Sequence, residues 1–389
     1  MDKLKTKVQN ADWWEIGYLI IYGFILIWEF FQTTMFEIAW PPKMGYVFAI
    51  ISCCYVVAKF IGKRSYTKKD IILSILILVA FVIPAFGADY AFLFWIGFLI
   101  VGAKDVSTTK LLKVYLFISI TMIVVTFAAS QCGIIEDLQY ILYEGEQLIV
   151  RHSYGIIYPT DYAAHVFYVV LALTVFLEDK LNLIVRSWMI ILVAMIIYTC
   201  ANAKTSTLCL LGFMVMCLME RVLRKHMYKF SKILAYIPLT CALVFLLLAY
   251  NYDASVNWKL VINKLLNGRL ELSKIAFDNY DIKLFGQYIP EVGSGASLEE
   301  KWDYFFIDDA YVRILMEYGI VLFIVTLVMM VVLARRFREK GQFLLVFALA
   351  IVSVHSIMEH HLLEVAYNPF LFMLFADIPK SKIIGGQNV

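Results

Sequence analysis

The sequence predicts an all-α polytopic membrane protein with about 12 transmembrane helices and a large, partly helical extracytoplasmic loop. Of its 389 residues, 62% are hydrophobic and only 17% are charged, whereas soluble domains are roughly half apolar. The charged residues cluster between apolar runs about as long as a bilayer is thick. One long polar segment, 251–310, interrupts the apolar runs, and ten acidic and six basic residues lie there among aromatic ones. A segment this polar belongs outside the lipid.

Each predicted span is an apolar run of roughly 20 residues, the length that a helix needs to cross the hydrocarbon core. In chain order the runs lie near 14–34, 44–62, 71–88, 90–104, 111–130, 157–177, 183–200, 204–220, 233–250, 311–333, 342–358 and 367–379. Two of them, 90–104 and 367–379, are short, and almost nothing separates 183–200 from 204–220. The first run follows three lysines but has no small-residue cleavage site, so we expect a retained helix rather than a signal peptide.

Lysine and arginine gather between alternate pairs of runs, and short cytoplasmic loops of membrane proteins are enriched in these residues. The basic clusters are Lys3/Lys5/Lys7, Lys59/Lys63/Arg64/Lys68/Lys69, Lys104/Lys110/Lys113, Arg221/Arg224/Lys225/Lys229/Lys232, Arg335/Arg336/Arg338/Lys340 and Lys380/Lys382. With 12 spans, all of them fall on the side of the N-terminus. We therefore expect a multi-pass protein of the cell membrane with both termini in the cytoplasm. It divides into spans 1–9 (1–250), the extracytoplasmic loop between spans 9 and 10 (251–310), and spans 10–12 with the C-terminus (311–389).

Motifs of soluble enzymes are absent from the sequence. It has no P-loop, dinucleotide fingerprint, HExxH or GxSxG pattern, and its seven cysteines show no metal-binding or redox spacing. No cofactor, no metal and no nucleic-acid partner are therefore expected. Any chemistry must come from loop residues and helix ends on one membrane face.

The first candidate group surrounds the predicted start of the sixth span. Arg151 lies at an outer helix mouth, where its planar donor fork suits a phosphate, although an arginine reaching toward lipid headgroups is an equal alternative. His152 could act as a base, but exposed loop histidines are more often inert. Asp161 follows in the segment Tyr158-Pro159-Thr160-Asp161, and Lys204 at the turn after 183–200 would add a cation.

The second group is Asn267-Gly268-Arg269, inside a helical pattern of apolar residues in the polar segment. An apolar stripe on a loop helix indicates that the helix lies on the membrane surface or packs over the mouth of the bundle. Arg269 would then be a second cation on the same side as Arg151. An ordinary solvated charge is the alternative.

The third group leads into the tenth span. Asp308 and Asp309 lie at the outer boundary, where a carboxylate could take a proton from a sugar hydroxyl. Either could instead cap the helix N-terminus, and we expect capping for one of them. Further along, Glu317 needs a partner inside the span, and Arg313 stands at the i,i+4 spacing.

The remaining outer polar residues are Glu359, His360, His361 and Glu364, between the last two predicted spans. Two adjacent histidines on a helix point to different faces. The pattern is therefore weak as a metal site, and we predict none there.

These motifs carry a resemblance to a known family. They are Arg151, Gly155 and Pro159-Thr160-Asp161; Asn267-Gly268-Arg269 with Ala276 and Leu284-Phe285-Gly286; and Asp308-Asp309-Ala310-Tyr311 with Leu315, Glu317, Tyr318 and Gly319. In these, and in the expected topology, the chain resembles the O-antigen polymerase/ligase superfamily, the Wzy-type polysaccharide polymerases of the GT-C class of membrane glycosyltransferases. The proline and second glycine of the family's loop motif are not cleanly present, since Lys283-Leu284-Phe285-Gly286-Gln287-Tyr288 stands there.

The resemblance implies polymerisation of lipid-linked oligosaccharide on the outer face, for capsular polysaccharide, exopolysaccharide or O-antigen. The growing glycan passes from undecaprenyl diphosphate to a hydroxyl of the incoming repeat unit, without a nucleotide sugar or metal. Arg151 and Arg269 map by motif onto the residues that hold the diphosphate, with Lys204 as a weaker addition. Asp308 or Asp309 is the expected base. A flippase and a chain-length regulator are the expected protein partners.

Around these residues, His152, Asp161 and Tyr311 are the expected substrate contacts. The ligase branch of the family has a histidine where this chain has Asp308, which favours a polymerase. Asp309 stands where the family often has asparagine, so which aspartate is the base stays open.

Three alternatives remain. A ligase-like transferase would differ only in its acceptor, and Asp308 is the sole sequence hint against it. A flippase of lipid-linked oligosaccharide would need ionisable residues in mid-membrane, where the sequence has few, namely Glu29, His165 and His355. For His165 a hydrogen-bonded structural role is favoured. A non-catalytic assembly partner would leave the outer arginines without a use.

Overall fold

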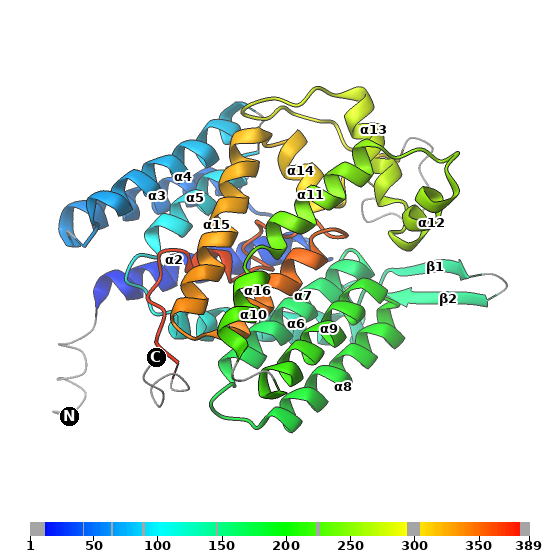
Figure 1. Cartoon of the computed structure of the whole chain (residues 1–389), viewed down its shortest axis with the longest axis horizontal. Helices are drawn as coiled ribbons and strands as arrows, with labels where there is room; N and C mark the ends of the chain where they lie inside the picture. The colour runs from blue at the N-terminus through cyan, green and yellow to red at the C-terminus, as the bar shows by residue number, and fades with distance from the viewer. Residues whose placement is uncertain are drawn as a thin grey trace.

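The computed structural model describes residues 12–41, 43–63, 65–87, 90–144, 147–222, 226–293 and 304–381. Several residues of the basic clusters and of the polar segment lie outside the described residues: Lys3, Lys5, Lys7, Arg64, Arg224, Lys225, Gly295, Trp302 and Lys382. The described chain is mostly helical, with one two-stranded sheet (Figure 1).

Eight helices in the described chain are long and apolar enough to cross a membrane. They are α2 (Trp13–Gln32), α3 (Met44–Lys63), α4 (Lys68–Gly87), α6 (Thr108–Gln131), α7 (Pro159–Phe176), α8 (Leu183–Ala201), the consecutive pair α10 (Met227–Leu234) and α11 (Ile237–Tyr250), and α15 (Gly319–Glu339). The expectation of a mostly helical, polytopic membrane protein is therefore confirmed. The expected number of 12 spans is not.

Two more predicted spans correspond to short apolar helices. They are α5 (Phe92–Gly102), of 11 residues, and α16 (Phe343–His355), of 13 residues. The predicted span 204–220 corresponds to α9 (Lys204–Val222), which packs against α8 after the turn at Asn202, a residue in the left-handed conformation.

The predicted helix at 367–379 is wrong. Only the short 3₁₀ turn η2 (Leu371–Met373) forms there, and the stretch is otherwise irregular although almost all of it is buried. Backbone without helical hydrogen bonds is tolerated at membrane depth only where protein covers it and supplies partners. Glu29 of α2 supplies two, because its carboxylate accepts hydrogen bonds from the backbone N–H groups of Val365 (2.9 Å) and Ala366 (3.2 Å). The hydroxyl of Tyr115 donates to the carbonyl of Tyr367 at 2.6 Å.

The predicted span 311–333 is also corrected, because it breaks into α14 (Ala310–Met316) and α15. A loop of the polar segment inserts at the break, where Gly286 and Gly319 both have positive φ, +82° and +93°. A Cβ on Gly286 would lie 2.1 Å from the carbonyl oxygen of Glu317, so only glycine fits. The loop carbonyls of Lys283 and Leu284 accept hydrogen bonds from the first N–H groups of α15, which no helical partner could satisfy.

The polar segment contains two helices, α12 (Asn257–Leu265) and α13 (Arg269–Asn279). The expected single helix through Asn267-Gly268-Arg269 is wrong, because Asn267 (φ 48°) and Gly268 (φ 83°) both take left-handed conformations and end α12. Arg269 is consequently the first residue of α13, which packs on α11 and α14.

The two ends of the bundle hold different parts of the described chain. At one end, the start of α2 lies near the last described residues, since Glu15 accepts a hydrogen bond from the N–H of Ser107, which itself pairs with Asp377. This end also holds Lys63, paired with Asp12 and Asp105, and Lys104, and we call it the basic end. The hairpin of β1 (Gln139–Glu144) and β2 (Gln147–His152) projects on the other side of the molecule, together with α12 (Figure 1).

Candidate active site

A cavity of about 430 Å³ lies away from the basic end, at the start of α7, the α8–α9 turn and the start of α13. Its volume is within the range of roughly 300–1,000 Å³ that is usual for small-molecule sites. Five of the site residues expected from the sequence line it: Arg151, Asp161, Lys204, Arg269 and Asp308. They come from five separate segments, so only the folded chain brings them together.

Three cations surround the cavity. Arg151 is near the end of β2, and its Nε donates a hydrogen bond of 2.8 Å to the carbonyl of Ala201, the last residue of α8. Lys204 begins α9, and Arg269 begins α13. The lining also holds three carboxylates, those of Asp161, Asp308 and Glu359, so cations and acids from several elements meet around one cavity.

Arg269 is paired with Asp308 across the cavity wall. One guanidinium nitrogen (Nη2) lies 3.2 Å from Oδ2 of Asp308, and both side chains are 16% exposed. The guanidinium also donates to the carbonyls of Met358 (3.4 Å) and Asn267 (3.2 Å), which hold it in place. Burial raises the pKa of Asp308, although Arg269 and Arg313 oppose the shift. A raised pKa makes this carboxylate a better proton acceptor than an exposed aspartate.

Asp309 has the other role that the sequence left open for the two aspartates, the capping of a helix. It is completely buried and does not line the cavity. Its carboxylate caps α14 by accepting a hydrogen bond of 2.7 Å from the N–H of Val312, and it accepts another of 2.8 Å from the hydroxyl of Ser273. Burial raises its pKa to about 7. The geometry gives Asp309 a structural role, and its expected catalytic role has no support from its position.

Two expected substrate contacts also lie outside the cavity lining. Tyr311 is fully buried, and its hydroxyl donates to the carbonyl of Ser353 at 2.7 Å. His152 lies on the hairpin, where its Nδ1 is 2.6 Å from a carboxylate oxygen of Asp137. Neither prediction is supported, because neither side chain reaches the space that a ligand in the cavity would occupy.

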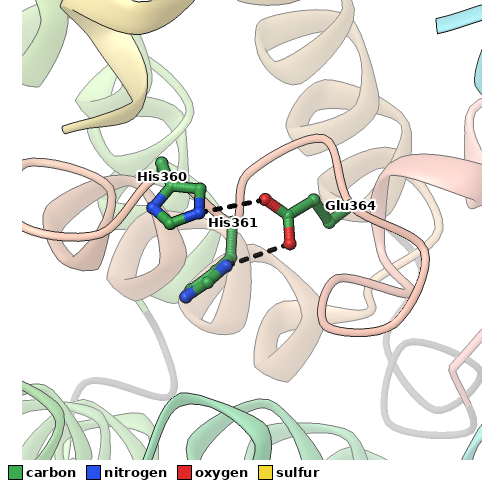
Figure 2. A group of neighbouring side chains, drawn as sticks. All are labelled: His360, His361 and Glu364. Carbon is green, nitrogen blue, oxygen red and sulfur yellow. Dashed lines mark hydrogen bonds and ion pairs between the residues drawn. The ribbon is translucent and has the colours of Figure 1, made fainter. Parts of the chain in front are cut away.

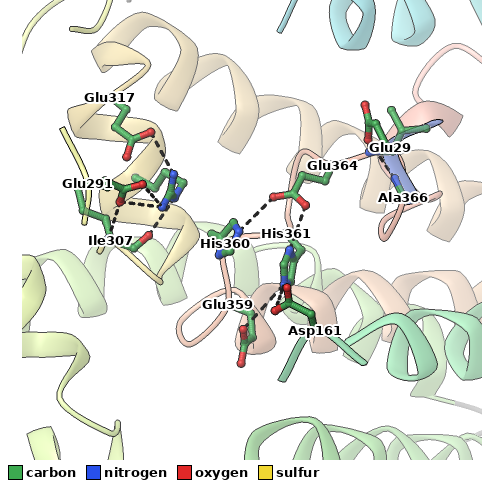
Figure 3. Close-up of polar contacts among 12 residues, drawn as sticks. Glu29, Asp161, Glu291, Ile307, Glu317, Glu359, His360, His361, Glu364 and Ala366 are labelled. Atoms are coloured by element: carbon green, nitrogen blue, oxygen red, sulfur yellow. Dashed lines mark hydrogen bonds and ion pairs between the residues drawn. The ribbon is translucent and has the colours of Figure 1, made fainter. Parts of the chain in front are cut away.

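Four titratable residues meet at the cavity wall: Asp161 and Glu359, which line the cavity, with His361 and Glu364 beside them (Figure 3). Asp161 lies in the first turn of α7, which Pro159 begins, and the others follow α16 in irregular backbone. Burial alone would lower the pKa of His361, but the carboxylates of Glu364 and Asp161 raise it to about 10. Burial raises the pKa of Glu359 to about 7, with Arg269 and His361 acting in the opposite direction.

The sequence prediction missed this cluster for two reasons. It treated the two histidines as helical, whereas they lie in irregular backbone, and Asp161 is far away in the chain. Figure 2 shows the Glu364 carboxylate beside both imidazole rings, with one contact to each. Its oxygens lie 3.4 Å from Nε2 of His360 and 3.0 Å from Nδ1 of His361. The ring of His361 also stacks on Tyr367, with centroids 3.7 Å apart.

A second buried ion network fixes the cavity wall from outside. One guanidinium nitrogen of Arg313, Nη2, lies 2.8 Å from each carboxylate oxygen of Glu291, and Nη1 lies 3.2 Å from Glu317. The expected pairing of Arg313 with Glu317 is therefore confirmed. The Arg313 guanidinium also lies 4.6 Å from the ring centroid of Phe306, which lines the cavity.

Compared with known proteins, the chain matches no family model, no curated protein sequence and no solved structure.

Proposed function

We propose that the protein is a glycosyltransferase that polymerises lipid-linked oligosaccharide repeat units on the outer face of the cell membrane. The observation that carries the proposal is the Arg269–Asp308 pair, which places an anion-binding group and a proton acceptor 3.2 Å apart on one cavity wall. A transfer from a lipid diphosphate to a sugar hydroxyl needs both groups near the reacting carbon.

The cations bind the diphosphate of the donor lipid. Arg151 and Arg269 present planar forks that suit phosphate oxygens, and Lys204 adds a point charge. Negative charge grows on the leaving diphosphate in the transition state, so cations fixed in advance by protein contacts stabilise that state more than the ground state. The backbone contacts of Arg151 and Arg269 provide this fixation.

Asp308 is the general base. It takes the proton from the acceptor hydroxyl as that oxygen forms a bond to the anomeric carbon of the donor sugar. The bond from this carbon to the phosphate oxygen breaks, and undecaprenyl diphosphate leaves with the electron pair. The proton remains on Asp308 until solvent removes it, and the glycan is now one repeat unit longer.

The proposed topology places the cavity outside the cell and both termini in the cytoplasm. Basic residues support this, since Lys63, Lys104 and Arg336 all lie at the basic end. Twelve crossings agree with that arrangement if α14 and α15 count as one and the irregular chain after α16 is the last. The two helices of the segment 251–310 then lie at the outer surface.

Flipping of the lipid is less well supported than transfer. The ionisable residues expected in mid-membrane each have a structural partner: Glu29 binds the N–H groups of Val365 and Ala366, His165 contacts the Thr33 hydroxyl at 3.0 Å, and His355 contacts the Ser206 hydroxyl at 3.0 Å. These contacts leave the three residues engaged within the bundle. A ligase-like transferase remains the second candidate, because it would use the same cavity with another acceptor.

The test is removal of the gene from the organism that carries it. We expect cells to keep a single lipid-linked repeat unit facing outward and to lose long polymer. Units that accumulate on the cytoplasmic side would instead support a flippase. Normal polymer that is no longer attached to its final acceptor would support a ligase.

A further inference from the structure

We propose that Asp161, Glu359 and His361 form a binding site for a divalent cation at the cavity wall. Nε2 of His361 lies 3.6 Å from Oδ1 of Asp161 and 3.9 Å from Oε2 of Glu359 (Figure 3). Each residue offers one ligand atom, and all three atoms lie within 4.8 Å of one another.

The spacing of these atoms is the first argument. A protonated imidazole that donates directly to a carboxylate closes to about 2.7–2.9 Å, and neither contact here is that short. Ligand atoms that share an ion at about 2.1 Å lie roughly 3.0–3.5 Å apart. The observed distances exceed this by a few tenths of an ångström. His361 is 1% exposed, and its Nε2 has no hydrogen-bond partner among the described residues. A buried nitrogen therefore faces the two carboxylates without a hydrogen bond to either.

The orientation of the histidine is the second argument. Nδ1 of His361 contacts the carboxylate of Glu364 at 3.0 Å, which leaves Nε2 as the nitrogen directed at Asp161 and Glu359. Histidine ligands usually donate their other N–H group to a carboxylate in this way. Glu364 contacts both His360 and His361 from one side (Figure 2) and is therefore already engaged as the orienting partner.

The position of the site is the third argument. Asp161 and Glu359 both line the cavity, so an ion held by them has coordination positions open toward a ligand there. Without an ion, these carboxylates would repel the anion that Arg151, Lys204 and Arg269 attract. A divalent cation removes this conflict and could itself bind diphosphate oxygens. That role rests on the proposed function, whereas the cation site itself does not.

One imidazole nitrogen and two carboxylate oxygens suit ions such as Mn²⁺ and Zn²⁺. The proposed cation site differs from two expectations drawn from the sequence. One is that the adjacent histidines hold no metal, and the other is the metal-free transfer that the resemblance implies. The spacing of residues in the sequence could not show this site, because Asp161 comes from another part of the chain.

The test uses the full-length protein purified in lipid nanodiscs and treated with a chelator. Titration with MnCl₂ alone, followed by electron paramagnetic resonance, should show one saturable site, which ZnCl₂ competes for. Asp161→Asn and Glu359→Gln keep the side-chain shape and should weaken binding at least about tenfold, and Glu364→Gln should weaken it by about tenfold through the orientation of His361. Asp308→Asn removes a nearby cavity carboxylate that is no ligand, and it should leave Mn²⁺ binding within about twofold of the wild type. Thermal unfolding confirms that each variant is folded.

The outcomes separate the two proposals. No saturable binding of Mn²⁺ or Zn²⁺, or equal binding in the folded Asp161→Asn and Glu359→Gln variants, overturns the cation site and leaves an ordinary protonated histidine among carboxylates. Specific binding in a protein that makes no polymer overturns the proposed function and leaves the cation site in place.

Discussion

The guanidinium of Arg269 and the carboxylate of Asp308 form an ion pair of 3.2 Å on the wall of a cavity. Arg269 is there because the left-handed turn at Asn267 and Gly268 starts a new helix with it. Asp308 is there because Asp309, not Asp308, caps α14. Two local backbone features thus create the pair on which the proposed transfer depends.

The first prediction separates the two aspartates. Asp308→Asn should slow repeat-unit addition by about 100-fold or more, which is the contribution typical of a general base. Asp309→Asn should stay within about threefold of the wild type, because asparagine caps a helix as well as aspartate does. The rates are measured with reconstituted protein and lipid-linked units on a polymer-length gel. The reverse ranking would transfer the role of base to Asp309.

The second prediction concerns the anion-binding arginines. Arg151→Ala and Arg269→Ala should leave the protein folded in the membrane but abolish long polymer. The lysine variants at both positions should recover only part of the activity, since an ammonium group keeps the charge but not the two-pronged geometry. His152→Ala is the control, because that side chain does not line the cavity, and it should leave polymer length unchanged. Long polymer of normal length from both alanine variants would remove the proposed role.

The third prediction tests the cap of α14. Asp309→Ala removes the acceptor for the Val312 N–H and the Ser273 hydroxyl, both of which are buried. We expect a loss of about 1–3 kcal/mol in the free energy of unfolding, seen as a lower Tm in detergent. Ser273→Ala removes a single hydrogen bond and should cost less. Equal Tm values for Asp309→Ala and wild type would contradict the capping role.

The fourth prediction tests the contact between the loop and the broken helix. Gly286→Ala should be poorly folded, because its Cβ would lie 2.1 Å from the carbonyl oxygen of Glu317. Gly133→Ala is a matched control: Gly133 also has a positive φ, +70°, but nothing lies within 4 Å of its Cβ position. It should cost only the roughly 1–2 kcal/mol of the left-handed conformation. Yield of folded protein and protease resistance measure the difference, and similar behaviour of the two variants would refute the close contact.

Residue pattern alone predicted much of the helical part of this protein. Apolar runs of bilayer length became helices such as α2 and α7, because hydrophobic length and helical hydrogen bonding are local properties. The pairing of Arg313 with Glu317 followed from their spacing on a helix. The expected cap at either Asp308 or Asp309 also formed, although its position within the pair was not predicted.

What the sequence by itself determined is therefore the membrane class, most helix positions and the candidate residues of the site. Only the tertiary structure decided which candidates meet: Arg151, Lys204, Arg269 and Asp308 line one cavity, whereas His152 and Tyr311 do not. It also decided that 367–379 stays irregular and that Asp161 lies beside His361. The physical reason is that these outcomes depend on partners distant in the chain. Irregular backbone is stable in the bundle only where α2, α6 and other elements supply its hydrogen bonds.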